Sequence, residues 1–307
     1  MNHTLSRRQF LATTAATGAF VTLHPFSAMA APNQAHLRVL STTDLHVHVH
    51  PYDYYADKPI DNVGLSRTAS IIEEVRSEST QSIQVDNGDF LQGNPMGDYI
   101  AYERGMSEGD MHPVMQAMNV LGYDCGTLGN HEFNYGVDFM DKVVQGADFP
   151  MVCANFVKSL GESAGKDDLF YKPYTLLDRE ITDGAGEKHM IKIGLIGFLP
   201  PQIMNWDKRH LEGKFNARDI LQAAKAWVPE MREAGADIVV ALSHSGISSD
   251  PESEGMANAA LYLAGVDGID ALVTGHSHLV FPSETYAGID GIDVGAGTLQ
   301  GKPATMG

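Results

Sequence analysis

One arrangement constrains the fold of this sequence more than any other: short apolar segments that each end in side chains able to bind metal ions. These side chains are carboxylates, an amide and imidazoles at five segment ends: Asp44 and His46, Asp89, Asn130 and His131, His244, and His276 and His278. In open α/β sheets the functional loops follow the carboxyl ends of the strands. We therefore expect these loops to meet at one edge of a sheet and to form one site.

Strand-like and helical segments alternate along most of the chain. Apolar or alternating runs predict strands at residues 36–43, 82–85, 123–128, 150–154, 238–242 and 271–274. Apolar residues at helical spacing predict helices at residues 63–77, 112–122, 136–146, 220–231 and 253–264. This alternation favours an α/β protein in which helices cover layered sheets, built as one compact domain.

The second half of the chain should add a β-hairpin and an incomplete end. Residues 174–181 and 189–198 predict two strands joined by a turn at 183–186, and the second strand should be central because it is apolar on both faces. Residues 294–299 predict one more strand. The chain then stops in residues 301–307 without a closing helix, so we expect the fold to be truncated at its C-terminus.

Net charge narrows the possible functions. The 307 residues carry a formal charge of −18 at pH 7, so we expect no nucleic-acid binding through a basic surface. An acidic surface also attracts phosphate substrates poorly. A phosphate site in this chain would therefore need local cations, and bound metal ions would supply them.

Residues 1–30 predict a twin-arginine signal peptide. Arginines at positions 7 and 8 precede an apolar run at 11–23, and an A-x-A pattern predicts cleavage after Ala30. We expect export to the periplasm, contact with the twin-arginine export machinery during translocation, and no membrane anchor, because the apolar run is too short to span a bilayer. The alternative is a chance pair of arginines before an uncleaved apolar anchor.

The two cysteines of the sequence, Cys125 and Cys153, leave one question open. A disulfide between them is possible in an exported protein. Both cysteines lie in apolar strand-like segments, however, where free buried cysteine is common. The sequence alone does not decide between the two states.

Residues 129–132, Gly-Asn-His-Glu, carry the most distinctive chemistry. Gly129 permits a tight turn that lets the next two side chains face one site. Asn130 offers a neutral oxygen ligand, and His131 an imidazole that titrates near neutral pH. We expect Glu132 to hold loop backbone, and Asp86 to cap the loop that follows its strand.

The ligand set is large enough for two divalent ions if one carboxylate bridges them. Carboxylate, amide oxygen and imidazole suit Mn, Zn, Co or Fe, and the sequence does not choose among them. Two such ions roughly 3.5–4 Å apart favour in-line displacement at a phosphoryl group. Alone, a histidine such as His244 is more often a core or capping residue, but the combination indicates a dinuclear hydrolase.

The motif series D-x-H, G-D, G-N-H-E, H and G-H-x-H, in this order, resembles the calcineurin-type metallophosphoesterase superfamily. More narrowly, residues 123–134 resemble the signature of the 5′-nucleotidase family. Residues 52–55, 85–89, 200–204 and 229–232 extend the resemblance to the branch that acts on 2′,3′-cyclic nucleotides and 3′-nucleotides. The resemblance covers essentially everything after the signal peptide, and it implies a layered αββα sandwich.

The resemblance also implies a role for each ligand position. The residues that match the ligands of one metal ion are Asp44, His46, Asp89 and His278. The residues that match the ligands of the other ion are Asp89, Asn130, His244 and His276. His131, next to Asn130, matches the catalytic histidine. Many relatives pair this histidine with an Asp three residues later, whereas this chain has Asn134, which can orient the ring but supplies no carboxylate.

The family's domain plan implies what this chain should hold. Relatives carry a second, C-terminal domain that binds the nucleotide base, and no part of this sequence matches it. We therefore expect residues 31–307 to be the metallophosphoesterase catalytic domain without that nucleotide-binding domain.

The resemblance implies that a small nucleotide is the substrate. The expected activity is hydrolysis of 2′,3′-cyclic nucleotides to 3′-nucleotides, and then of 3′-nucleotides to nucleoside and phosphate. One alternative is a 5′-nucleotidase, nucleotide-sugar hydrolase or thiosulfohydrolase on the same scaffold. Another is an inactive fragment that only binds metal.

Overall fold

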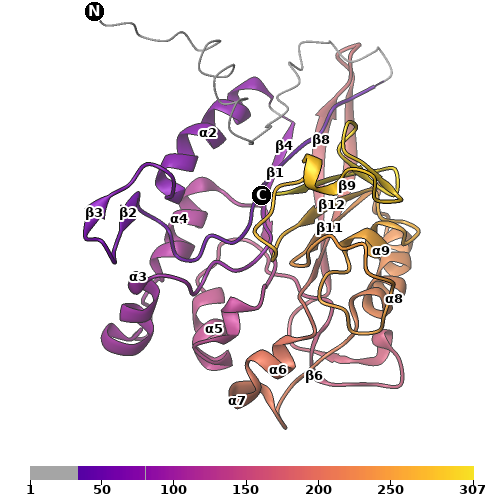
Figure 1. The fold of residues 1–307 in the computed structure, drawn as a ribbon. Coiled ribbons are helices and arrows are strands. Elements are labelled where there is room, and N and C mark those ends of the chain that lie inside the picture. Colours follow the sequence, from indigo (N-terminus) through magenta and orange to yellow (C-terminus); the bar gives the residue numbers. More distant parts are fainter. Residues whose placement is uncertain (1–33, 80) are drawn as a thin grey trace, which may run out of the picture.

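Two β-sheets lie face to face, with helices on both outer sides (Figure 1). The computed structural model describes residues 34–79 and 81–307. The predicted signal peptide at 1–30 lies outside the described residues. Among those described, no helix has both the length and the apolar character needed to cross a membrane.

The first sheet is short and entirely parallel. Its order is β1-β4-β5, and the strands are β1 (Arg38–Thr42), β4 (Ser82–Asp86) and β5 (Cys125–Gly126). The helices on its outer side are α2 (Leu65–Glu78), α4 (Pro113–Leu121) and α5 (Val137–Val144) (Figure 1). Apolar side chains of these helices, such as Met115 and Met140, are fully buried in one core.

The second sheet has the order β13-β14-β15-β12-β11-β9-β8. Its strands are β8 (Tyr174–Thr182), β9 (Lys188–Phe198), β11 (Ile238–Ser243), β12 (Ala271–Thr274), β13 (Ile292–Asp293), β14 (Thr298–Leu299) and β15 (Lys302–Met306). Strands β9, β11, β12 and β15 lie parallel to one another, and β8 pairs antiparallel with β9 as the predicted hairpin. The edge strand β14 is antiparallel to both β13 and β15. The helices α8 (Ile220–Glu233) and α9 (Ala260–Ala264) cover its outer side (Figure 1).

A separate apolar layer joins the two sheets. Val85 and Cys125 of the first sheet pack in one cluster with Leu195, Val240 and Val273 of the second, and all are buried. The predicted αββα sandwich is therefore confirmed. Cys125 and its counterpart Cys153 are both buried free thiols.

Shorter elements connect these layers. The additional strands are β2 (Tyr52–Asp53), β3 (Lys58–Pro59), β6 (Phe156–Ser159), β7 (Asp168–Leu169) and β10 (Asn216–Ala217). The additional helices are α3 (Pro95–Asp98), the π-helix η1 (Tyr99–Arg104), α6 (Ile203–Trp206), α7 (Lys208–Leu211), and the 3₁₀ turns η2 (His131–Phe133), η3 (Ala164–Lys166) and η4 (Glu284–Tyr286).

Four predicted elements are wrong in extent. The strand predicted at 123–128 is limited to β5, and the strand predicted at 294–299 is limited to β14. Residues 150–154 form only isolated bridges at Met151 and Val152, not a continuous strand. The helix predicted at 253–264 is confined to α9, because side chains bind the backbone just before it. The Ser245 hydroxyl accepts the amide hydrogen of Ala259 and donates to the carbonyl of Ala257, so these groups are not free for helical bonds.

The C-terminal segment also differs from its prediction. Residues 302–306 form β15, a strand that pairs with β12 on one side and β14 on the other. No strand was predicted at residues 302–306, so this element was missed. A lysine and a proline at its start weakened the strand signal, because both are uncommon inside sheets.

Candidate metal centre

The loops after β1, β4, β5, β11 and β12 bring the predicted ligands together. Three groups of side chains each place their ligand atoms within 4.8 Å of one another: Asp44, His46 and His278; His46, Asp89 and His131; and Asp89, His244 and His276. The register explains this meeting, because Thr42 pairs with Asp86 and Ser243 pairs with Thr274 at the carboxyl ends of adjacent parallel strands.

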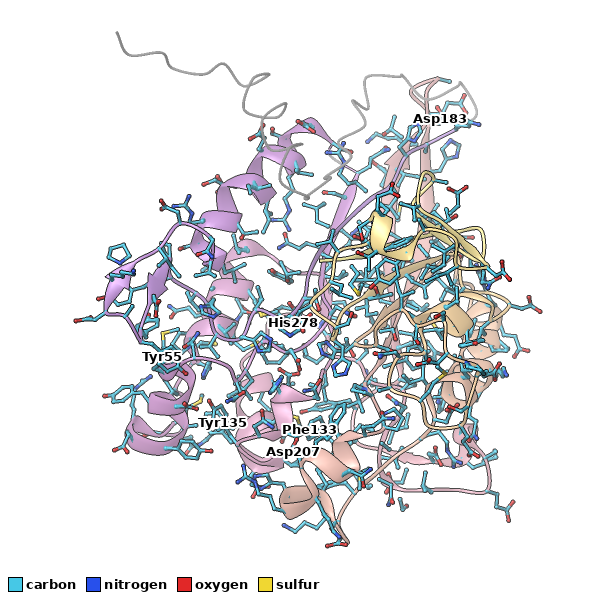
Figure 2. The ribbon with its side chains drawn as sticks, in the orientation of Figure 1. Tyr55, Phe133, Tyr135, Asp183, Asp207 and His278 are labelled. Carbon is cyan, nitrogen blue, oxygen red and sulfur yellow. The ribbon has the colours of Figure 1, made fainter. Side chains whose placement is uncertain are left out.

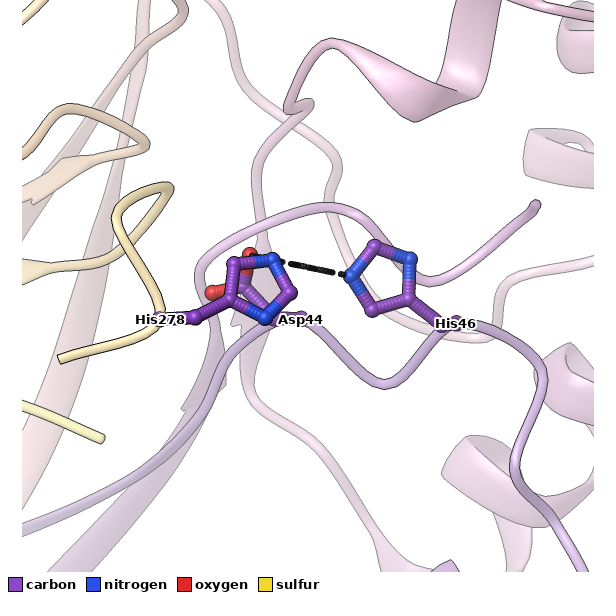
Figure 3. Close-up of side chains that lie close together, drawn as sticks. All are labelled: Asp44, His46 and His278. Atoms are coloured by element: carbon purple, nitrogen blue, oxygen red, sulfur yellow. Dashed lines mark hydrogen bonds and ion pairs between the residues drawn. The ribbon is translucent and has the colours of Figure 1, made fainter. Parts of the chain in front are cut away.

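The first cluster consists of Asp44, His46 and His278, whose side chains point toward one another (Figure 3). Asp44 Oδ1 lies 3.3 Å from His278 Nε2 and 3.9 Å from His46 Nε2. The two Nε2 atoms are 3.3 Å apart. His46 Nδ1 is 2.7 Å from the carbonyl of Gln92, so that nitrogen donates and Nε2 presents its lone pair to the cluster.

The second cluster is more deeply buried. His244 is fully buried, and its Nε2 lies 2.9 Å from Asp89 Oδ2. His244 Nδ1 donates to the carbonyl of Asn87 at 2.8 Å, which again leaves Nε2 for a ligand. Asn130 Oδ1 lies 2.8 Å from His276 Nδ1, so the fourth predicted member is also in place.

Asp89 links the two clusters. It belongs to a group with His46 and His131 and to a group with His244 and His276. Its other oxygen, Oδ1, accepts the backbone amide hydrogen of His131 at 2.7 Å, which places the catalytic candidate beside the centre. Asp89 therefore lies within reach of ligand atoms from both clusters.

The backbone at the ligand positions is strained. Asp44, His46, Asp89, His276 and His278 all have positive φ angles, between 45° and 71°. Side-chain-bearing residues rarely adopt this region, and such strain concentrates at functional sites. The loops therefore hold these side chains toward one another in a backbone conformation that costs free energy, as is typical of a functional site.

Close backbone approach accounts for two glycines. A Cβ atom on Gly129 would lie 2.3 Å from Asp89 Oδ1, and one on Gly88 would lie 2.3 Å from the nitrogen of Gly129. Glu132 fixes the same two loops: its carboxylate accepts amide hydrogens from Asp89 at 2.9 Å and from Gly129 at 2.6 Å. The predicted structural role of Glu132 is confirmed, and Asp86 likewise accepts the amide hydrogen of Gly88 as predicted.

The residues present fit divalent metal ions. Asp44 Oδ1 and His244 Nε2 are buried and have no hydrogen-bond partner, although each faces other ligand atoms. Buried polar atoms are normally paired, so both atoms point to a bound cation. Imidazole, carboxylate and amide oxygen suit a transition metal.

The electrostatics of the second cluster agree with this fit. Burial alone would lower the pKa of His244, but the charge of Asp89 and its close contact outweigh burial and raise the pKa to about 9. For Asp89, burial would raise the pKa, but His244 and His131 hold it well below its ordinary value. The pair is therefore held together by opposite charges, and a bound cation would supply the same compensation for the Asp89 carboxylate.

The sequence-based prediction missed two residues of the segment after β9. The Trp206 ring stacks on His276, with ring centroids 5.5 Å apart and an angle of 25° between planes. Asp207 is 2 % exposed and bonds Asn134. A signal was available: β9 is an apolar strand paired in parallel with β11, so the loop after Phe198 must reach the same sheet edge as His244.

The fold and the site define a class of protein. A family model described as calcineurin-like phosphoesterase matches residues 37–280. The chain belongs to the calcineurin-like phosphoesterase family.

Individual relatives carry names that are more specific than the family description. A protein of Yersinia enterocolitica named 2′,3′-cyclic-nucleotide 2′-phosphodiesterase/3′-nucleotidase is 51% identical over 270 residues, which are 88% of this chain and 40% of that protein. A protein of the same name from Haemophilus influenzae is 43% identical over 98% of this chain and 45% of its own length. The chain therefore spans less than half the length of these curated relatives.

A solved structure agrees with the fold. The crystal structure of the calcineurin-like phosphoesterase YfkN from Bacillus subtilis superimposes with a TM-score of 0.84 at 44% identity. The match covers 89% of this chain and 81% of the solved chain.

Proposed function

We propose that this protein is a dinuclear metal-dependent phosphoesterase acting on nucleotides. Its substrates would be 2′,3′-cyclic nucleotides, opened to 3′-nucleotides, and 3′-nucleotides, cleaved to nucleoside and phosphate. Residues 31–307 would form the catalytic domain. The observation that carries the proposal is the shared carboxylate of Asp89, which lies in two ligand groups at once.

Seven side chains would hold the two ions. One ion would take Asp44, His46, Asp89 and His278, and the other would take Asp89, Asn130, His244 and His276. When bound, the ions would supply the positive charge that activates water and binds phosphoryl oxygens. Mn, Zn, Co and Fe all suit this mixture of oxygen and nitrogen ligands.

His131 would handle the proton of the leaving group. As water forms a new bond to phosphorus, the bond from phosphorus to the 2′-oxygen of the cyclic ester breaks, and His131 would donate a proton to that oxygen. In the second reaction the 3′-oxygen leaves in the same way. Asn130, the neighbouring residue, would help to bind the phosphoryl group from the metal side of the site.

The preference for cyclic and 3′-nucleotides is supported by the names of the more similar relatives. Those named 2′,3′-cyclic-nucleotide 2′-phosphodiesterase/3′-nucleotidase are 43% to 51% identical to this chain. A 5′-nucleotidase of Bos taurus is 26% identical over 79% of the chain. A 5′-nucleotidase activity is therefore the less supported candidate. Solved structures of a sulfate thiohydrolase and an NAD nucleotidase share the fold at only 16% and 20% identity, so they do not favour those activities.

We also propose that the protein acts in the periplasm. The support is the twin-arginine pattern at residues 7–8 and the cleavage pattern that ends at Ala30. Replacing both arginines by lysine should leave the protein uncleaved and in the cytoplasmic fraction. A variant that is still processed and exported would contradict twin-arginine transport.

The decisive experiment for the activity is a substrate panel with added Mn²⁺, each reaction with and without a chelator. The substrates are 2′,3′-cyclic AMP, 3′-AMP, 5′-AMP and bis(p-nitrophenyl) phosphate. We expect chelator-sensitive turnover of the first two over 5′-AMP. If only bis(p-nitrophenyl) phosphate were turned over, the protein would be a phosphoesterase, but the proposed nucleotide specificity would be wrong. Silence on all four with two metal ions bound would favour an inactive metal-binding protein.

A further inference from the structure

We propose that Asp207 is a positioning residue for His131 and acts through Asn134. This inference rests on the proposed function, in which His131 works at the phosphoryl group. The three residues form a continuous hydrogen-bonded chain that runs from the metal centre to a buried carboxylate. Family resemblance alone does not lead to it, because Asn134 replaces the residue that pairs with the histidine in many relatives.

The geometry of the chain is short and aligned. His131 Nδ1 lies 2.6 Å from Asn134 Oδ1. The other end of the same amide, Asn134 Nδ2, donates to both oxygens of Asp207, at 3.1 Å and 3.2 Å. In Figure 2, Asp207 is seen just below Phe133, the residue that precedes Asn134. The amide of Asn134 therefore links the imidazole to the carboxylate.

The direction of these hydrogen bonds is determined by Asp207. A carboxylate only accepts, so the amide nitrogen of Asn134 must face Asp207 and its oxygen must face His131. An amide oxygen also only accepts, so His131 Nδ1 must carry a hydrogen. Neutral His131 is thereby held in one tautomer, and its Nε2 is left free to take up the proton that His131 would then donate to the leaving oxygen. Without Asp207, the Asn134 amide can rotate so that its nitrogen faces His131. It would then donate to an unprotonated Nδ1, which is the other tautomer of His131.

The surroundings keep Asn134 in this position. Asp207 is 2 % exposed, so water does not compete for its oxygens. The helix α7 that follows Asp207 also holds the backbone of Asn134: Arg209 Nη2 donates to its carbonyl at 3.0 Å, and His210 Nε2 lies 3.3 Å from it. Asn134 is thus fixed at its side chain and at its backbone by one segment.

The same segment touches the metal side of the site. Trp206, the residue before Asp207, stacks on the ligand candidate His276. Residues 200–204, which the sequence comparison with the cyclic-nucleotide branch singled out, lead directly into this segment. The loop after β9 therefore orients two histidines of the centre at once, and Asp207 is its contact to His131.

A carboxylate swap tests the proposal. In N134D a half-buried carboxylate would meet the buried carboxylate of Asp207 at hydrogen-bond distance, and the two would repel. In D207N the new amide can donate or accept, so Asn134 is no longer held in one direction. The double variant N134D/D207N restores one carboxylate and one amide in reversed order. The carboxylate now at position 134 can accept the hydrogen of His131 Nδ1, while the amide now at position 207 donates to that carboxylate.

We expect each single variant to lower kcat for 3′-AMP about 10- to 100-fold, the range for partners that orient a functional histidine. KM should change little, and the double variant should regain most of the loss. E212Q, an equivalent charge change on the exposed end of α7, should match the wild type. Wild-type kcat in D207N, or a double variant no faster than the slower single, would overturn the proposal.

A second readout does not depend on turnover. Nitrogen NMR of ¹⁵N-histidine-labelled protein, recorded at alkaline pH where imidazoles are neutral, reports the tautomer of His131, with H131Q identifying its signal. We expect only the Nδ1–H form in the wild type and a mixture in D207N. An unchanged signal in D207N would overturn the positioning role. If the wild type turned over no nucleotide, the proposed function would fail while this measurement still tested Asp207.

Discussion

Single histidines of the centre differ sharply in burial, and burial decides what their removal does. His244 is fully buried against Asp89, whereas the side chain of His278 is 58% exposed. Both would ligate a metal ion in the proposed centre. Only His244, however, neutralises a buried charge in the metal-free protein, so the two positions should separate metal binding from stability.

We predict that H244A destabilises the metal-free protein by about 3 kcal/mol, because it leaves the Asp89 carboxylate buried without its partner. H278A should cost less than about 1 kcal/mol, since its contact with Asp44 is partly solvated. Both variants should lose roughly one metal ion per chain. Urea unfolding with chelator, together with metal analysis, measures both effects. Equal stability losses would contradict this difference.

Among single residues, the sequence predicted which side chains meet at the site, but it did not predict the residues that support them. Asp44, His46 and His278 each follow an apolar strand, so their meeting at one sheet edge followed from topology. Asp207 had no such signal of its own, because an Asp before a short helix most often is only a cap. Its contact with Asn134 depends on how two loops far apart in sequence meet, which periodicity does not report.

Among the elements, the turn between β5 and α5 depends on glycine for its close packing. A methyl group on Gly129 would lie 2.3 Å from Asp89 Oδ1, a distance that atoms cannot keep. We predict that G129A displaces Asp89 and lowers both metal content and activity at least about tenfold, as loss of a positioned ligand does. G165A, whose added methyl would lie 4.0 Å from Ala226 in ordinary contact, is the matched control. Full metal content in G129A would contradict the prediction.

Helix α4 carries a titratable cap. His112 precedes Pro113, is 1 % exposed, and accepts the amide hydrogen of Val114 through Nδ1 at 3.3 Å. Burial, with the charge of Arg104, lowers the pKa of His112 to about 4. Between pH 6.5 and about pH 4, the imidazole of His112 therefore binds a proton in the unfolded chain but stays neutral in the folded chain. This contribution to stability is present above that window and is lost as pH falls through it.

We predict that H112N loses less stability than the wild type on acidification from pH 7 to 5. Asparagine keeps a capping oxygen but does not titrate, and the difference should be about 2 kcal/mol from the two pKa values of His112. Urea unfolding at both pH values, with the metal removed, measures it. His189, which is exposed on β9, provides the matched H189N control. If the wild type and H112N lost the same stability between pH 7 and 5, the proposed role of the His112 cap would be wrong.

Element prediction succeeded where apolar pattern and capping agreed. α4 begins after His112 with a proline and ends at Gly122 in a left-handed conformation, and its predicted limits are confirmed. α9 is shorter than predicted because the side chain of Ser245 engages the preceding backbone. A hydrogen bond across 14 residues of loop leaves no trace in local periodicity.

For the whole molecule, the ligand set is divided between the two sheets. Asp44, His46, Asp89 and Asn130 follow strands of the first sheet, and His244, His276 and His278 follow strands of the second. Between the sheets lies an apolar core that holds Val85 against Leu195 and Val240. Bound metal would connect the two sheets a second time, at their edge. Metal binding should therefore stabilise the packing of the two sheets against each other.

We predict that saturating Mn²⁺ at both sites raises the unfolding temperature of the whole molecule by about 10–20 °C over the chelated protein. Binding at about 100 times Kd adds roughly 2.7 kcal/mol per site, and each kcal/mol shifts Tm by about 2–4 °C in a domain of this size. D89N replaces the shared carboxylate by a neutral amide and should show a much smaller shift, whereas D57N, on the loop between β2 and β3, should respond like the wild type. Calorimetry with and without chelator measures the shift.

Because the ligands come from both sheets, we expect one cooperative unfolding transition whose midpoint rises when metal binds. A shift of equal size in D89N, or a metal-dependent transition separate from the main one, would show that metal does not connect the two sheets.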